Sequence, residues 1–188
     1  MPRIPEITAK EALPEDKHPI FDAIAASRGR VGYPFSLLLN SPEVAGRVAH
    51  LGTYLRFEST LAPTDRELAI ITAAREFDCA FEWGAHVRAA RNAGVREEAI
   101  AVVDNDASLA ALTSEEALIV EYGRQLFRRH RVTDVTFQAA RAHFGDQGVT
   151  ELTALMGYYG LLACALNAFE VQPAPEAPQL SSIRHLRE

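Results

Sequence analysis

Residues 66–100 read RELAIITAAREFDCAFEWGAHVRAARNAGVREEAI and carry most of the information about the fold and the site. Inside this stretch, the segment CAFEWGAH places Cys79, Glu82 and His86 at relative positions 0, 3 and 7. Side chains three or four residues apart share one face of a helix, so these three groups can point into one cavity. A thiol, a carboxylate and an imidazole together can move protons, and electrons if the thiol takes part.

Helical periodicity dominates the chain on both sides of this segment, and no run of alternating β-branched residues predicts a strand. The four residues from Thr64 to Glu67 are typical of a capping box that opens a helix over about 65–77. Asp78 is expected to cap the next helix, over about 79–94, and Gly94 is expected to end it. Further helices are predicted over residues 19–28, 42–58, 96–104, 114–131, 134–145 and 150–170.

Two other helix starts have clear capping signals. Ser41 and Pro42 are typical of the cap and the first helical position of the helix over 42–58. Thr113 and Glu116 are the outer residues of a second capping box. The sequence therefore predicts an all-α protein with an irregular arm over residues 1–18, one helical domain over 19–171 and an extended, proline-containing tail over 172–188.

Composition restricts the class of protein. Of the 188 residues, 48% are hydrophobic and 23% are charged, which is ordinary for a globular domain and excludes global disorder. The net charge is −6 and no basic patch is visible, so no nucleic-acid partner is expected. Two cysteines are too few for a secreted disulfide framework. The charged, proline-containing N-terminus is unlike a signal peptide, and a cytoplasmic location is expected.

The segment LTALMGYYGLLACALNAF, residues 152–169, carries no charge over 18 positions, the lower length limit for a membrane span. It also contains Thr153, Asn167, two tyrosines and two glycines. We therefore expect a small-residue helix buried between other helices, and no membrane partner. A chain of this size has difficulty covering both this helix and the apolar stripe over 42–58, so a homo-oligomer is expected.

Glu82 precedes His86 by four residues, the spacing at which a carboxylate best supports an imidazolium on a helix. Such a pair is typical of a general acid and base. The alternative is an exposed ion pair on the helix surface with no catalytic role. Phe81 and Trp83 on the same helix indicate that much of it is covered.

Cys79 has two interpretations. Near a helix N-terminus its thiolate is stabilised and can act as a nucleophile, whereas in a core the thiol is inert. The position that would complete C-x-x-C holds Glu82, and Cys164 lies among apolar residues and is expected to be buried and inert. A metal site drawn from Cys79, Glu82 and His86 would need a further ligand. No second cysteine or histidine cluster provides one, so no metal and no cofactor are expected.

Glu67 can close the capping box with Thr64, face the site, or do both with its two oxygens. A guanidinium group matches the geometry of a carboxylate, so arginines are candidates for binding an anionic substrate. The candidate arginines are Arg28, Arg30 and Arg75, and the aromatic residues considered as pocket lining are Phe21, Tyr33, Phe35 and Trp83.

The segment RELAIITAAREFDCAFEWGAHVRAARNAGVREEAI resembles the core of the carboxymuconolactone decarboxylase family, which includes the alkylhydroperoxidase D-like proteins. The earlier PFSLLLNSPEVAGRVAHLGTYLRFESTLAP and the later GYYGLLACALNAFEV resemble helices on either side of that core, so the resemblance covers most of residues 30–171. It implies an alkylhydroperoxidase D-like multi-helix bundle that assembles as a dimer, trimer or hexamer.

Peroxidase-type members of that family carry C-x-x-C-x-x-x-H, with two thiols as the redox pair and with the histidine and an upstream glutamate as a proton relay. By this resemblance, Cys79 matches the first thiol and His86 the histidine. Glu67 matches the upstream glutamate, whereas Glu82 replaces the second thiol. Decarboxylase-type members have a glutamate four residues before the histidine and no C-x-x-C, and they are more similar to this chain.

The residues and the resemblance together indicate four catalytic candidates, namely His86, Glu82, Glu67 and Cys79. The leading hypothesis is a decarboxylase-like lyase that acts on a small cyclic carboxylate or lactone by cofactor-free acid–base chemistry. One alternative is a peroxiredoxin-type, alkylhydroperoxidase D-like peroxidase that uses Cys79. The other is a non-catalytic module for ligand binding or assembly.

Overall fold

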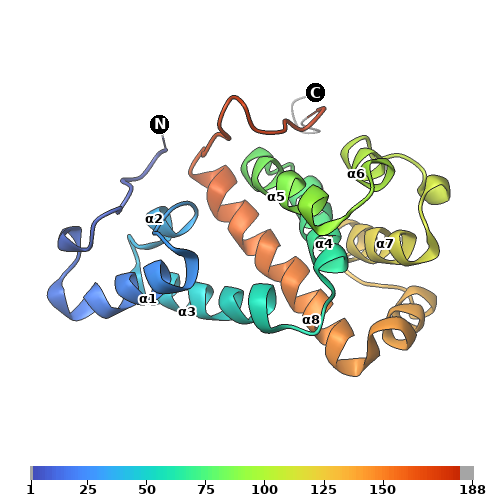
Figure 1. Ribbon diagram of the computed structural model, residues 1–188, viewed down its shortest axis with the longest axis horizontal. Coiled ribbons are helices and arrows are strands. Elements are labelled where there is room, and N and C mark those ends of the chain that lie inside the picture. The colour runs from blue at the N-terminus through green and yellow to red at the C-terminus, as the bar shows by residue number, and fades with distance from the viewer. Residues whose placement is uncertain (1, 183–188) are drawn as a thin grey trace. The chain divides into compact units, whose positions relative to one another are not determined.

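The computed structural model describes residues 2–182, and over this range it contains helices and no β-strand, which confirms the predicted all-α class. Its residues form two compact units. The first comprises the chain up to Glu58 together with Ala165–Val171, and the second comprises Ser59–Cys164 and the chain from Gln172 onward. The helices, labelled in Figure 1, are α1 (His18–Arg28), α2 (Phe35–Leu38), α3 (Pro42–Thr53), α4 (Pro63–Glu76), α5 (Ala80–Ala93), α6 (Glu97–Asp104), α7 (Ser114–Arg129) and α8 (Asp134–Ala168).

In the first unit, α1, α2 and α3 share one small hydrophobic cluster. The segment before α1 forms two short 3-10 turns, η1 (Lys10–Ala12) and η2 (Glu15–Lys17), and reaches the cluster through Ile7 and Leu13. Burial of these side chains attaches the N-terminal segment to the unit. The buried members of the cluster are Leu13, Ile24, Phe35, Leu39, Ala45 and Ala49.

Helix α3 begins where the sequence predicts. Ser41 is its N-cap residue and Pro42 its first helical residue, although the Ser41 side chain makes no capping hydrogen bond. The helix continues into a π-helical turn, η3 (Tyr54–Glu58), so the helix predicted over 42–58 is present with a change of winding at its end.

Helix α4 is buried on every side. Each residue from Glu67 to Arg75 has at most 5% of its surface exposed. The run LAIITAA between these two residues is apolar right around the helix, so α4 is stable only when other helices surround it. Helices α5, α6 and α7 pack directly against it. The two charged residues at the ends of the run are buried as well, and each therefore needs a partner.

Helices α7 and α8 come close to α4 and the residues after it at two glycines. A Cβ atom on Gly123 of α7 would lie 2.7 Å from the side chain of Thr72 and 3.1 Å from that of Met156. A Cβ atom on Gly160 of α8 would lie 3.0 Å from the ring of Phe77. A Cβ at Gly123 would force its neighbours to shift, and one at Gly160 would press on the Phe77 ring, so the helices of the second unit pack closely at these glycines.

Two predicted helix ends are confirmed. Gly94 ends α5 in the left-handed conformation, with φ of 92°. Thr113 and Glu116 form a full capping box at the start of α7, in which the Glu116 N–H donates to the Thr113 hydroxyl at 3.2 Å and the Thr113 N–H donates to the Glu116 carboxylate at 2.9 Å.

The capping box predicted at Thr64 is wrong. Helix α4 begins at Pro63, after the N-cap residue Ala62, and no side chain caps it. The Thr64 hydroxyl instead donates to the carbonyl of Ala93 at 2.9 Å. Proline suits the first helical position because it has no N–H and its φ is already helical, so the helix begins earlier than the box would place it.

Asp78 does not cap α5, contrary to prediction. The N-cap residue is Cys79, and Asp78 adopts the left-handed conformation with φ of 48°. Its carboxylate forms an ion pair with the guanidinium of Arg75, and both side chains are buried. A buried cation without a partner carries a larger penalty than a missing cap, so Asp78 serves Arg75.

Helix α8 is interrupted once. At Gly145 the backbone is non-helical, with φ of 72° and ψ of 177°, so two helical segments meet there. The second segment follows Gly145 directly, whereas the sequence predicts that it begins at Thr150. By length and composition α8 could cross a membrane, but 61% of its most apolar window is buried inside the protein, as in the core helix of a soluble protein.

The C-terminal tail, described as far as residue 182, runs over the outer face of α5 (Figure 1). A Cβ atom on Gly84 would lie 3.0 Å from Ala177 Cβ and 3.2 Å from the carbonyl of Pro178. The Arg88 guanidinium donates to the carbonyl of Glu176 at 2.6 Å. The tail therefore covers the helix that carries the candidate site, and the part of the predicted extended tail over 183–188 lies outside the described residues.

We predict that Gly123→Ala destabilises the protein by about 1–3 kcal/mol, because its new methyl group has no room between α4 and α8. The matched control is Gly157→Ala in α8, where a Cβ would meet nothing within 4 Å. That change removes backbone freedom from the unfolded chain and should stabilise by about 0.5–1 kcal/mol. Urea unfolding measures both, and equal effects of the two variants would contradict the packing described here.

Candidate active site

Glu67 of α4 and His86 of α5 meet inside the second unit. The distance from His86 Nδ1 to Glu67 Oε2 is 2.8 Å, and the two side chains are 8% and 7% exposed. With the Glu67 carboxylate ionised, Nδ1 is the donor and Glu67 the acceptor of this hydrogen bond. The sequence left open whether Glu67 caps α4 or faces the site. The structure places it in the site.

Glu82 approaches the other ring nitrogen of His86. Its Oε2 lies 3.5 Å from His86 Nε2, one helical turn along α5, and its side chain is 4% exposed. Both ring nitrogens of the histidine thus face carboxylate oxygens. Because the pair is buried, the alternative of an exposed ion pair on the helix surface is wrong.

The aromatic ring of Tyr159 on α8 contacts the imidazole. The two ring centroids are 4.9 Å apart and the ring planes meet at 83°, an edge-to-face contact. Sequence reasoning did not select this residue. The available signal was a pair of tyrosines in a helix of otherwise small or aliphatic residues, since a large side chain with a polar tip is unusual there.

Cys79 lies at the start of α5 and is fully buried. Burial raises the pKa of its thiol to about 12, although hydrogen bonds from the backbone of Glu82 and Phe81 oppose the shift. The favourable effect of a helix N-terminus on a thiolate is therefore present but is smaller than the loss of solvation. At neutral pH this group is a protonated thiol.

Cys164 is exposed, so the expectation that it is buried is wrong. It lies on the solvent side of α8, whose other faces are buried. The apolar residues next to Cys164 in the sequence are packed on those other faces. The exposure of Cys164 depends on which face of the helix it occupies, and the apolar character of its sequence neighbours does not predict it.

The candidate arginines have structural partners. Arg75 is paired with Asp78, and Arg28 stacks its guanidinium over the Phe35 ring at 4.2 Å while donating to the carbonyl of Ala49 at 3.0 Å. Arg30 is exposed. These contacts hold Arg28 and Arg75 in the fold of their own units.

The four aromatic residues considered as pocket lining are distributed between the units. Trp83 is buried in the second unit, and the others belong to the first. Within residues 2–182, no group of three or more histidine, cysteine, aspartate or glutamate side chains is arranged to hold a metal ion. A histidine between two carboxylates can take part in proton transfer.

Comparison with known proteins relates this arrangement to a family. Residues 42–120 match the model of the carboxymuconolactone decarboxylase family. A search of the curated proteins found no significant match.

Several solved structures share the fold. The alkylhydroperoxidase AhpD core of a peroxidase-related protein from Ralstonia eutropha is 20% identical, with a TM-score of 0.75, and 93% of each chain is covered. A peroxidase-related protein from Silicibacter sp. is 16% identical, with a TM-score of 0.71 and coverage of 93% of this chain and 95% of that one. The debrominase Bmp8 is 12% identical, with a TM-score of 0.69 and 92% of each chain covered.

At these identities the structural likeness establishes the fold alone, and the match to the family model covers residues 42–120. Both agree with the predicted alkylhydroperoxidase D-like helical bundle. This chain therefore has the helical fold of the alkylhydroperoxidase D-like proteins, and its residues 42–120 match the carboxymuconolactone decarboxylase family model.

Proposed function

We propose that this protein is a cofactor-free acid–base enzyme, a decarboxylase-like lyase that acts on a small cyclic carboxylate or lactone. The observation that carries the proposal is the buried His86 between two carboxylates, one on its own helix and one on α4. A histidine held in this way is suited to giving and taking a proton repeatedly at one ring nitrogen. The family match is consistent with the proposal.

The proposed reaction needs one proton and no added electrons. The bond between a ring carbon and its carboxylate carbon breaks, CO₂ leaves, and the electron pair is delocalised into the lactone as an enolate. His86 as imidazolium then gives its Nε2 proton to the carbon atom and regains a proton from water. Glu67 keeps the Nδ1 proton in place throughout, and Glu82 orients the Nε2 side of the ring.

Burial contributes to the proposed chemistry as well. Charges on Glu67 and Glu82 interact more strongly with the imidazole in a dry interior than in water. The two groups are held before any substrate arrives, so they need no reorganisation during the reaction. One related structure, a cysteine-to-alanine variant of the debrominase, has the small ring 2,3,4-tribromopyrrole bound, which supports a small cyclic substrate for the fold.

The alternative of a thiol peroxidase that uses Cys79 has less support. The peroxide-attacking species is the thiolate, and burial with a pKa of about 12 keeps this sulfur protonated. The residue at the position of a second thiol is Glu82, which can accept and orient protons but cannot form a disulfide. Both observations favour proton chemistry over redox chemistry at this site.

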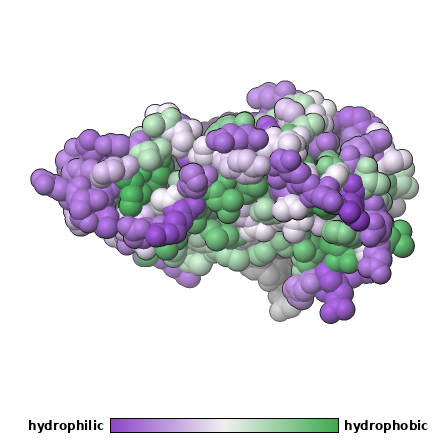
Figure 2. Space-filling view, turned by 90° about the horizontal axis from the view of Figure 1, so that it is seen from below, coloured by the Kyte–Doolittle hydropathy of each residue, from purple (hydrophilic) through white to green (hydrophobic). Residues whose placement is uncertain are grey.

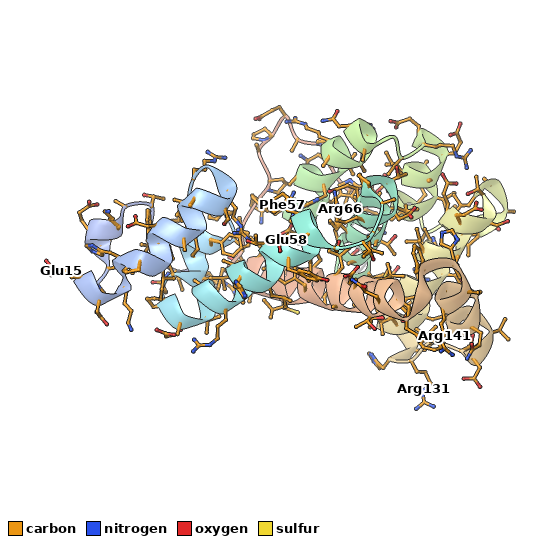
Figure 3. The ribbon with its side chains drawn as sticks, turned by 60° about the horizontal axis from the view of Figure 1, so that its bottom comes forward. Glu15, Phe57, Glu58, Arg66, Arg131 and Arg141 are labelled. Carbon is orange, nitrogen blue, oxygen red and sulfur yellow. The ribbon has the colours of Figure 1, made fainter. Side chains whose placement is uncertain are left out.

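We also propose that the protein works as a homo-oligomer. Four large apolar side chains are exposed along α3 and η3, and Phe57 at the end of η3 has 58% of its surface exposed. Figure 3 labels Phe57, and Figure 2 shows apolar surface on one face of the molecule. Exposed apolar side chains on one helix favour association. The four residues are Val44, Leu51, Tyr54 and Phe57.

For the acid–base proposal, we expect purified protein to release CO₂ from carboxymuconolactone or a related unsaturated lactone acid. His86→Gln should lower kcat by roughly 10²–10⁴, because it keeps a donor for Glu67 but cannot transfer a proton. Glu67→Gln keeps an acceptor but removes the charge, so a smaller loss of kcat is expected. His50→Ala, at an exposed histidine, is the matched control.

Undiminished turnover by His86→Gln would contradict the mechanism. Binding of these lactone acids in a thermal-shift assay, without any chemical change over hours, would favour the non-catalytic module.

For Cys79, we expect slow alkylation by iodoacetamide and no oxidation by mild peroxide, in contrast to the exposed Cys164. With a pKa of about 12, the thiolate fraction at pH 8 is about 10⁻⁴ and rises tenfold with each pH unit. The rate at Cys79 should therefore increase with pH up to the point of unfolding. Peptide mass spectrometry of Cys164→Ser, which leaves Cys79 alone, measures this, and rapid modification at pH 7 would restore the peroxidase alternative.

For assembly, we expect light scattering at micromolar concentration to give the mass of an oligomer. Phe57→Glu should lower that mass, because a charge replaces apolar surface on η3. Val135→Glu is the control, since Val135 is 82% exposed at the start of α8 and lies away from this stripe in sequence. A monomeric wild-type protein would contradict the proposal.

A further inference from the structure

We infer that Tyr159 of α8 is a positioning residue for His86: its ring keeps the imidazole turned toward Glu67. The inference deepens the proposed function and rests on it for its catalytic consequence. It begins from the edge-to-face contact, with 4.9 Å between the ring centroids and 83° between the ring planes.

An imidazole has two soft torsions, so its orientation must come from its neighbours. Glu82 lies on the same helix as His86, so it orients the ring only relative to α5. Glu67 and Tyr159 are supplied by two other helices, α4 and α8. The hydrogen bond from Nδ1 to Glu67 acts in the plane of the ring at 2.8 Å. The tyrosine ring is nearly perpendicular to the imidazole plane and in contact with it, so it restricts rotation of the imidazole.

Tyr159 is itself rigidly held. Only 2% of its surface is exposed, and its ring contacts that of Tyr158 at 5.4 Å and 81°. The next residue, Gly160, brings α8 close to the Phe77 ring just beyond α4. A side chain on a packed helix places a neighbour more accurately than one on a loop. The ring is thus a fixed wall for His86.

The contact also keeps the hydrogen bond dry. Tyr159 and His86 are both buried, so the tyrosine ring occupies volume that water would take beside the imidazole. Water at that place would compete with Glu67 for the Nδ1 proton and weaken the charge-assisted bond. Removal of the ring should therefore weaken the hydrogen bond between His86 and Glu67 in two ways, through loss of orientation and through entry of water.

The test uses the Nδ1 proton of His86, observed by NMR in the folded protein labelled with ¹⁵N-histidine and assigned by its loss in His86→Gln. We expect a sharp downfield resonance in the wild type, since a proton bonded to a buried carboxylate exchanges slowly with water. Tyr159→Phe should keep this resonance because the ring remains. Tyr159→Leu should broaden it or abolish it, and Tyr158→Leu, which removes the ring behind Tyr159, should have the same effect to a smaller degree.

The matched control is Tyr122→Leu, at a tyrosine buried in the same unit whose hydroxyl bonds to Thr153 at 2.7 Å. This variant removes a comparable side chain and should keep the resonance. The inference is overturned if the wild type lacks the resonance, if Tyr159→Leu keeps it as sharp as the wild type, or if Tyr122→Leu loses it equally.

A kinetic measurement separates this inference from the proposed function. With carboxymuconolactone as the probe, Tyr159→Leu should lower kcat roughly 10²-fold with little change in KM, the usual cost of a misplaced catalytic group, and Tyr159→Phe should restore it. If no variant, wild type included, turns over this probe, the decarboxylase proposal fails while the NMR result still decides the role of Tyr159. Loss of the resonance in Tyr159→Leu with unchanged kcat would overturn the catalytic consequence alone.

Discussion

The complete burial of α4 from Glu67 to Arg75 is the constraint on which the second unit depends. An apolar run that covers the whole circumference of a helix forces the charged residues at its ends, Glu67 and Arg75, into the interior. Unpaired, each would cost several kcal/mol. Glu67 pairs with His86, and Arg75 pairs with Asp78. Eight residues separate the two charged residues of α4, and eight residues also separate their partners, which follow in the reverse order along the chain. The pair of Glu67 and His86 joins α4 to α5 and is the candidate site, whereas the pair of Arg75 and Asp78 holds the turn between these helices.

Stability and chemistry therefore share one set of contacts. The hydrogen bond between Glu67 and His86 satisfies a buried carboxylate, and it also leaves Nε2 as the nitrogen able to exchange a proton. Glu82 stands beside that nitrogen, and Tyr159 closes another side. A group that is held for structural reasons needs little reorganisation to act as an acid or base, and this is the physical basis for the proposed function.

Helix α5 shows how a single different residue in the C-x-x-C-x-x-x-H pattern changes the chemistry that the site favours. With Glu82 at the position of a second thiol, the segment that begins at Cys79 contains one sulfur and two proton-carrying groups. Burial then keeps that sulfur protonated, against the effect of the helix N-terminus. Whether desolvation or the backbone amides decide the pKa of the thiol depends on how deeply the thiol is buried. The spacing of residues in the sequence does not show how deeply a residue is buried.

Periodicity and caps in the sequence determined the all-α class, the approximate extent of most helices, the end of α5 at Gly94 and the capping box of α7, because these features depend on interactions within a few residues. Spacing also placed Glu82 one turn from His86. Only the tertiary structure decided that Glu67 serves His86 and does not cap α4, that Asp78 serves Arg75, that Cys164 is exposed, and that Tyr159 stands against the imidazole. Each of these outcomes involves either the burial of a charge or the face of a helix that a distant segment covers. The free energy of burial depends on neighbours far away in the chain, and local sequence contains no record of them.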